Sequence, residues 1–110
     1  MRANGAGVRA TVFLSEDDTW QGRSLCHHVV AEARRLGLAG ATVSRAVEGY
    51  GAPTVLHTDR LLSASDDLPL VVTIIDSEEH IQHLLRELEQ PLDGRMVVLD
   101  AVTILHGPLG

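Results

Sequence analysis

Two arginines have neighbours that suit anion binding. Arg45 interrupts the apolar positions of a strand-like segment, and Arg95 follows Asp93 and Gly94 between two regular segments. A buried guanidinium is costly unless it is compensated, so Arg45 either reaches an anion in a cleft or pairs with an acid. That acid would be Glu48 or an aspartate of a neighbouring subunit. A glycine beside an arginine can offer donors to phosphate oxygens, although Asp-Gly alone is also an ordinary turn signal.

A long connection after the second predicted strand is the other candidate for function. It covers residues 49–67 and begins with Gly49, Tyr50 and Gly51, whose two glycines allow a sharp turn and close approach to a ligand or partner. Loops of this length inside a compact domain are usually functional. Its three leucines argue against a disordered segment.

A metal site is the weaker possibility. His80, His83 and Glu87 are three and four residues apart, so they share one side of a predicted helix. A metal site normally needs three or four ligands in good geometry, and this side is also where solvated polar residues belong. Cys26 occupies an apolar helix position, which favours a small buried side chain over a nucleophile.

Hydrophobic periodicity divides the chain into six elements that must position these residues. Strands are predicted at 8–14, 41–48, 68–75 and 96–105, and helices from about 23 to 36 and from an N-cap at Asp76 to Pro91. This order predicts an α+β ferredoxin-like βαββαβ sandwich, with a four-stranded antiparallel sheet and both helices on one face. We expect one domain over 1–110 with an ordered core of about 8–106, the first seven residues and the last four being frayed.

The strands at 68–75 and 96–105 are apolar on both faces, whereas a sheet covered by helices on one side should alternate. An apolar patch of this extent rarely stays exposed to water. We therefore expect a second copy of the chain to cover it in a homo-oligomer; the alternative is an unusually apolar monomer surface.

Composition excludes several classes of protein. The 110 residues carry nine basic and fifteen acidic side chains, aromatic residues are 3%, and there is one cysteine. An acidic chain with few aromatics is unsuited to coating nucleic acid, and a single cysteine excludes a disulfide framework. No apolar run would span a bilayer and no signal peptide is evident, so we expect a cytoplasmic protein without membrane insertion. The absence of a phosphate-binding loop motif or nucleophile elbow predicts no enzymatic activity.

The chain from Val8 to about His106 resembles the PII-like signalling proteins, in particular the DUF-190 branch. The resemblance rests on LAGATV at 38–43, VEGYG at 47–51, HT at 57–58 and DLPLVV at 67–72. It implies a homotrimer that binds adenine nucleotides in the clefts between subunits. It also implies that 49–67 is a T-loop, which docks on a partner protein such as a membrane transporter or an enzyme.

Carried onto this sequence, the resemblance assigns effector binding to Arg45, Gly49, Tyr50, Gly51, Gly94 and Arg95, and partner docking to His57, Thr58 and Arg60. The usual PII signature has a glycine directly before the aspartate. This chain departs from it, because Leu92 occupies that position before Asp93. Tyr50 lies between two glycines, so nucleotidylation of a T-loop tyrosine does not carry over. We expect a non-enzymatic PII-like sensor with no cofactor beyond an adenine nucleotide effector. The alternatives are a metal-binding trimer of the copper-tolerance type and an interaction module without nucleotide binding.

Overall fold

The computed structural model describes residues 5–46 and 68–105. The strands and helices in chain order are β1 (Gly5–Ser15), β2 (Thr19–Trp20), β3 (Arg23–Ser24), α1 (Leu25–Arg35), β4 (Thr42–Arg45), β5 (Pro69–Asp76), α3 (Glu78–Glu87) and β6 (Met96–Ile104). The predicted loop residues Gly49, Tyr50, Gly51, His57, Thr58 and Arg60 lie outside the described residues.

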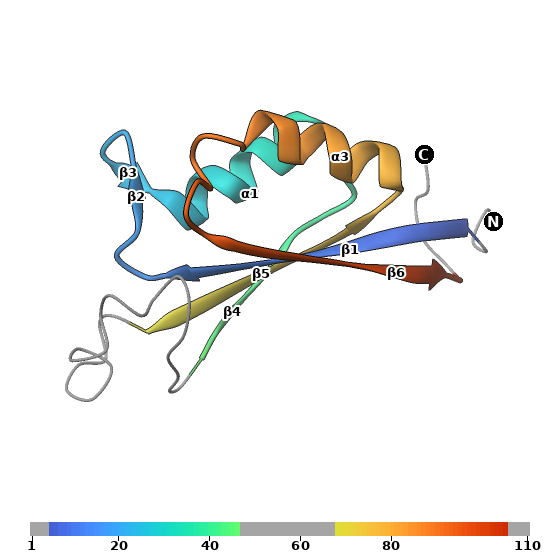
Figure 1. Ribbon diagram of the computed structural model, residues 1–110, viewed down its shortest axis with the longest axis horizontal. Coiled ribbons are helices and arrows are strands. Elements are labelled where there is room, and N and C mark those ends of the chain that lie inside the picture. The colour runs from blue at the N-terminus through green and yellow to red at the C-terminus, as the bar shows by residue number, and fades with distance from the viewer. Residues whose placement is uncertain (1–4, 47–67, 106–110) are drawn as a thin grey trace.

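One antiparallel sheet has the strand order β4-β5-β1-β6, and both helices cover the same face of it (Figure 1). The predicted α+β ferredoxin-like βαββαβ fold is therefore confirmed. Alternate residues of the central strand β1 point at the helices, and Ala10, Val12 and Leu14 are fully buried there. Leu25 of α1 and Leu84 of α3 close over them, so the core lies between the helices and the middle of the sheet.

The helix ends follow from local hydrogen bonds. Ser24 caps α1, since its hydroxyl accepts from the amide of His27, and Gly37 ends the helix with a φ of 81°. The predicted Asp76 cap of the second helix is wrong: Ser77 is the N-cap and accepts from the amide of His80. Asp76 is instead the last residue of β5, and its side chain is buried.

Two segments are more regular than predicted. The first strand begins at Gly5 rather than Val8, because residues 5–7 pair with the end of β6. Residues 15–22, which lie between the first predicted strand and the first predicted helix, contain β2, and β2 pairs with β3 in a short hairpin. Gln21 and Gly22 form its two-residue turn with φ values of 52° and 82°, the conformation that matches the twist of tight hairpins. Helix α1 accordingly starts at Leu25, two residues later than expected.

The sheet face opposite the helices, which we call the open face, carries many apolar side chains. Its residues, read from the strand register, are Arg9, Thr11, Phe13, Thr42, Ser44, Val71, Thr73, Ile75, Met96, Val98, Asp100 and Val102. Val72 and Ile74 of β5 are buried under the helices while Ile75 is exposed on the open face, as the two-faced pattern predicted. Within residues 5–46 and 68–105, no helix is long and apolar enough to cross a membrane.

Candidate anion-binding site

The two candidate arginines lie at the same end of the sheet, where β1 and β4 end and β5 and β6 begin (Figure 1). The β2–β3 hairpin and the turn that leads into β6 lie at this end as well. Residues 46 and 68, which flank the segment 47–67, are also here: the amide of Ala46 donates to the carbonyl of Pro69 at 2.9 Å. Loop ends gathered at one edge of a rigid sheet are where binding sites are commonly built.

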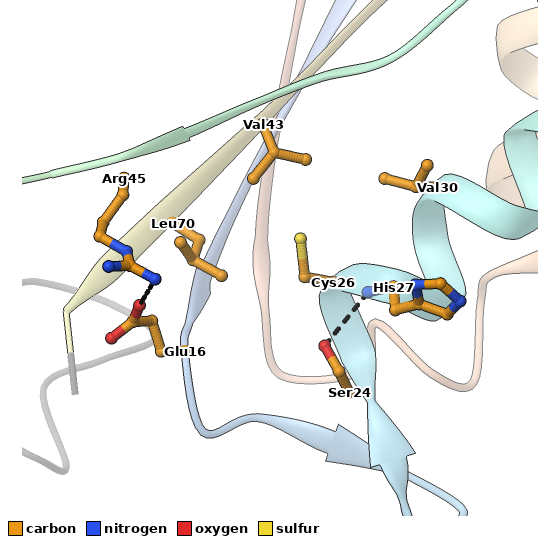
Figure 2. A pocket seen from close by; sticks show the side chains of 8 residues that line it. All are labelled: Glu16, Ser24, Cys26, His27, Val30, Val43, Arg45 and Leu70. Atoms are coloured by element: carbon orange, nitrogen blue, oxygen red, sulfur yellow. Dashed lines mark hydrogen bonds and ion pairs between the residues drawn. The ribbon is translucent and has the colours of Figure 1, made fainter. Parts of the chain in front are cut away.

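A pocket of about 570 Å³ opens between the start of α1 and the β4 edge of the sheet (Figure 2). Its volume is within the range of small-molecule sites. The lining side chains are Glu16, Ser24, Cys26, His27, Val30, Val43, Arg45 and Leu70. Arg45 and Leu70 stand on the sheet side, while Cys26 and Val30 face them from α1. Partial burial raises the pKa of the Cys26 thiol, so at neutral pH this wall is apolar.

Arg45 is paired, but with a different acid from the one expected. Its Nη2 lies 2.6 Å from Oε2 of Glu16 (Figure 2). The arginine is 65% exposed rather than buried, because β4 is an edge strand, while Glu16 is only 14% exposed. Glu48, the acid suggested by the sequence, lies outside the described residues. The guanidinium therefore presents donors to the pocket while one of its nitrogens is held by the chain's own carboxylate.

Arg95 is held by the same acidic loop. Its Nη2 contacts Oδ1 of Asp18 at 3.1 Å, and the second oxygen of Asp18 accepts from the amide of Ser15 at 2.8 Å. Asp18 is 9% exposed. Among the described residues, the buried Nε of Arg95 has no hydrogen-bond acceptor. A buried donor without an acceptor is costly, and an anion that reached this atom would relieve that cost.

Gly94 occupies the turn that the sequence indicated. Its φ is 80°, and the turn is closed by a hydrogen bond of 2.9 Å from the amide of Arg95 to the carbonyl of Leu92. Glycine at the third position of such a turn adopts positive φ without steric cost. The amide of Asp93 also donates back along the chain, to the carbonyl of Gln90 at 3.1 Å. The guanidinium of Arg95 and the backbone at Gly94 are thus the donors that this turn can offer to a ligand.

The structure does not bring the two arginines of one chain together. Arg45 of β4 pairs with Leu70 of β5, which in turn pairs with Leu14 of β1. On the other side of β1, Met96 pairs with Phe13, so Arg95 comes level with Leu14 as well. The arginines therefore lie on one row at opposite edges of the sheet, about 14 Å apart across three strand spacings. One chain by itself therefore does not place both side chains in a single cleft.

Sequence reasoning missed the two carboxylates that hold these arginines. Glu16 and Asp18 belong to an acidic run directly after the first strand, and no local pattern distinguishes them from the other acids of that run. The available signal was the position of that run at the end of a central strand, which places it beside the ends of both neighbouring strands.

Comparison with known proteins places this chain in a family. The family DUF190, described as Uncharacterized ACR, matches residues 7–104, nearly the whole chain. The chain belongs to the DUF190 family. A UPF0166 protein of Aquifex aeolicus (strain VF5) is 35% identical over 95 residues, covering 86% of this chain and 90% of the relative. The UPF0166 protein MJ1524 of Methanocaldococcus jannaschii is 30% identical over 91 residues, covering 81% and 83%.

PII-like proteins are among the solved structures that share this fold. CPII from Thiomonas intermedia K12, a nitrogen regulatory PII-like protein bound to ADP, AMP and bicarbonate, has a TM-score of 0.69 at 14% identity, covering 93% of this chain and 91% of CPII. A PII-like signaling protein from Thermus thermophilus has a TM-score of 0.59 at 20% identity, covering 91% and 90%. This DUF190 chain therefore has the PII-like fold, which confirms the resemblance found in the sequence.

The histidine-bearing face of α3 has other contacts in this DUF190 chain. His80 turns its Nδ1 to Oδ1 of Asp76 at 2.7 Å, and Glu87 contacts Arg35 at 3.3 Å. His83 is exposed. Over residues 5–46 and 68–105, no three histidine, cysteine or acidic side chains are gathered as metal ligands. His80 and Glu87 thus make hydrogen bonds and ion pairs that join α3 to β5 and α1.

Proposed function

We propose that this DUF190 protein is a non-enzymatic PII-like regulatory protein that binds an adenine nucleotide between the subunits of a homotrimer. Several observations support the proposal: the family, the PII-like fold, and the two arginines at the loop-bearing end of the sheet. The similar fold of CPII was solved with ADP and AMP, both of which carry phosphate and adenine. The same fold here carries arginine donors and an apolar-walled pocket, which suit those two parts of a nucleotide.

The observation that carries the proposal is the incomplete hydrogen bonding of the Arg95 guanidinium. Its buried Nε has no acceptor among the described residues, although its Nη2 is held by Asp18. Beside it, Gly94 exposes backbone in a turn with positive φ. A phosphate oxygen can accept from a guanidinium and a backbone amide together, and such charge-assisted contacts are the stronger kind of hydrogen bond. We assign the phosphate to Gly94 and Arg95.

The separation of the arginines favours a site shared between subunits. Because Arg45 and Arg95 stand at opposite edges of one sheet, a ring of identical subunits can place the β4 edge of one chain beside the β6 edge of the next. The open face, with Met96 and Val98 exposed, would face the inside of the ring. Each cleft would then receive Arg45 from one subunit and Arg95 from its neighbour.

In this proposal the segment 49–67 serves as the docking loop, with His57, Thr58 and Arg60 meeting a partner protein such as a transporter or an enzyme. Supporting this role, Ala46 and Leu68 flank the segment at the same end of the sheet as the pocket. The effector in the cleft would shift the population of loop conformations toward the one that binds the partner. We place this regulation in the cytoplasm, where adenine nucleotides are abundant.

Arg95→Ala tests the nucleotide site. We expect the variant to bind AMP and ADP about ten- to one-hundredfold more weakly, since a charge-assisted hydrogen bond is worth about 1.5–3 kcal/mol. Isothermal titration calorimetry of the purified protein measures this, with Arg34→Ala as the matched control. Arg34 is an exposed arginine in the last turn of α1, so its loss changes the net charge equally. Equal affinities of Arg95→Ala and wild type would contradict the site. Absence of nucleotide binding to wild type would favour an interaction module instead.

A further inference from the structure

Glu16 makes two side-chain contacts that point in different directions. Its Oε2 lies 2.6 Å from Nη2 of Arg45, and its Oε1 accepts from the amide of Leu68 at 3.3 Å. Its own amide donates to the carbonyl of Leu68 at 3.0 Å. The carboxylate is therefore fixed to the start of β5 by one oxygen and holds the pocket arginine with the other.

The electrostatic character of this pocket depends on the ion pair between Arg45 and Glu16. Arg45 and Glu16 are the arginine and the carboxylate among its lining residues, and apart from Ser24 and His27 the remaining walls are apolar or thiol. The two side chains neutralise each other in the structure. An anion approaching Arg45 must share the guanidinium with Glu16 and meets the negative charge of the same carboxylate at close range. Arg45 is the more exposed partner, so it is the one that a ligand can reach.

We propose that Glu16 is a built-in competitor for the anionic effector at Arg45, so that the chain's own carboxylate limits nucleotide affinity. The inference rests on the proposed function, because it concerns the same ligand and the same arginine. Glu16 does not need to leave its place for the effector to bind. Its Oε1 stays on the Leu68 amide while Oε2 gives up the guanidinium, since the two oxygens have separate partners. Glu16 therefore lowers affinity from within the pocket, although its carboxylate donates no hydrogen bond to the phosphate.

Glu16→Gln removes the negative charge and keeps the hydrogen bond to the amide of Leu68. A glutamine side-chain oxygen can still accept from the Leu68 amide, so the start of β5 keeps its contact. We expect AMP to bind about fivefold more tightly to this variant. A factor of this size corresponds to the free energy of a surface ion pair at the upper end of its usual range. If Glu16 had only a structural role, its substitution would disturb the pocket and weaken AMP binding. A gain in affinity therefore distinguishes competition from a structural role. Glu89→Gln, at an exposed glutamate after α3, is the control for net charge and should bind AMP as wild type does.

A double-mutant cycle shows whether the effect acts through Arg45. In the Arg45→Ala background, Glu16→Gln should give less than half of the gain, because the contested guanidinium is gone. If wild type binds AMP and Glu16→Gln binds it equally or more weakly, the inference is overturned and the nucleotide site stands. A full gain that persists in the Arg45→Ala background also overturns it. If neither wild type nor Glu16→Gln binds AMP, the proposed function itself fails.

Discussion

Val98→Asp is expected to convert the assembled protein into monomers. Val98 lies on β6 in the open face, opposite Thr11 of β1, and is 43% exposed in the single chain. Its substitution should leave the fold of one chain intact, because the helix-facing core does not include it. In an assembly built on the open face, however, the aspartate would be buried without a partner, which costs several kcal/mol for each subunit. Sedimentation velocity, or size exclusion with light scattering, measures the mass of the particle.

Ala31→Asp is the matched control for this assembly experiment. Ala31 is exposed on α1, which covers the opposite face of the sheet, and the substitution introduces the same charge. We expect Ala31→Asp to stay assembled and Val98→Asp to dissociate, with circular dichroism confirming that both are folded. An assembled Val98→Asp protein would show that the open face is not the interface. A monomeric wild type would contradict the homotrimer.

Asp76→Ala is expected to lower the free energy of unfolding by about 2–4 kcal/mol, because it removes a buried carboxylate and leaves its three partly buried donors without an acceptor. Asp76 is 3% exposed and accepts from the amides of Ala39 and Ser77 and from the ring of His80, at 2.9, 2.7 and 2.7 Å. One carboxylate thus joins the end of β5 to the start of α3 and to the connection between α1 and β4. Urea unfolding followed by circular dichroism measures the loss.

His80→Ala separates the contribution of the ring from that of the backbone contacts. His80 supplies one of three bonds and is partly exposed, so we expect its loss to cost about 1 kcal/mol. If the two substitutions cost the same, the amides of Ala39 and Ser77 contribute nothing and this account of Asp76 is wrong.

The same carboxylate makes stability depend on acid pH. Burial alone raises the pKa of Asp76, but the hydrogen bonds from Ala39, Ser77 and His80 outweigh it and hold the pKa below its usual value. A group whose pKa is lower in the folded state stabilises the protein above its unfolded pKa of about 3.9, and that stability is lost as pH falls through the folded value. Wild type should therefore lose stability in acid more steeply than Asp76→Ala.

Most of the fold could be predicted from local patterns. The alternation in β1 and the two-faced pattern of β5 depend only on neighbouring residues, and so does the glycine that ends α1. The β2–β3 hairpin was missed because its strands are two residues long, too short to show a period. The sequence predicts Asp76 as the cap of α3 because Glu79 follows three residues later, but Ser77 is an equally good capping residue. The choice depends on the amide of Ala39, which is 37 residues away in sequence.

The sequence singled out the two arginines of the candidate site, but it could not predict where they lie relative to each other. The apolar pattern around Arg45 predicted a buried arginine that faces an anion or is paired with an acid; the ion pair is present, but the side chain is exposed because β4 is an edge strand. That the partner is Glu16 depends on β1, β5 and β4 being neighbours in the sheet, which no local pattern contains. The distance between Arg45 and Arg95 likewise follows from strand order. Topology, rather than residue type, decides whether two functional side chains of one chain can act together.

The placement of Arg45 and Arg95 at opposite edges of the sheet has a genetic consequence. If each cleft takes one arginine from each of two chains, then chains lacking Arg45 and chains lacking Arg95 are separately inactive but complement each other when coexpressed. With random mixing in a closed ring, about a quarter of the clefts would contain both arginines. A chain lacking both would instead inactivate two clefts of every assembly that it joins. If the site is shared in this way, alleles should be interpreted in pairs, because one substitution would remove one side of a cleft rather than a whole subunit.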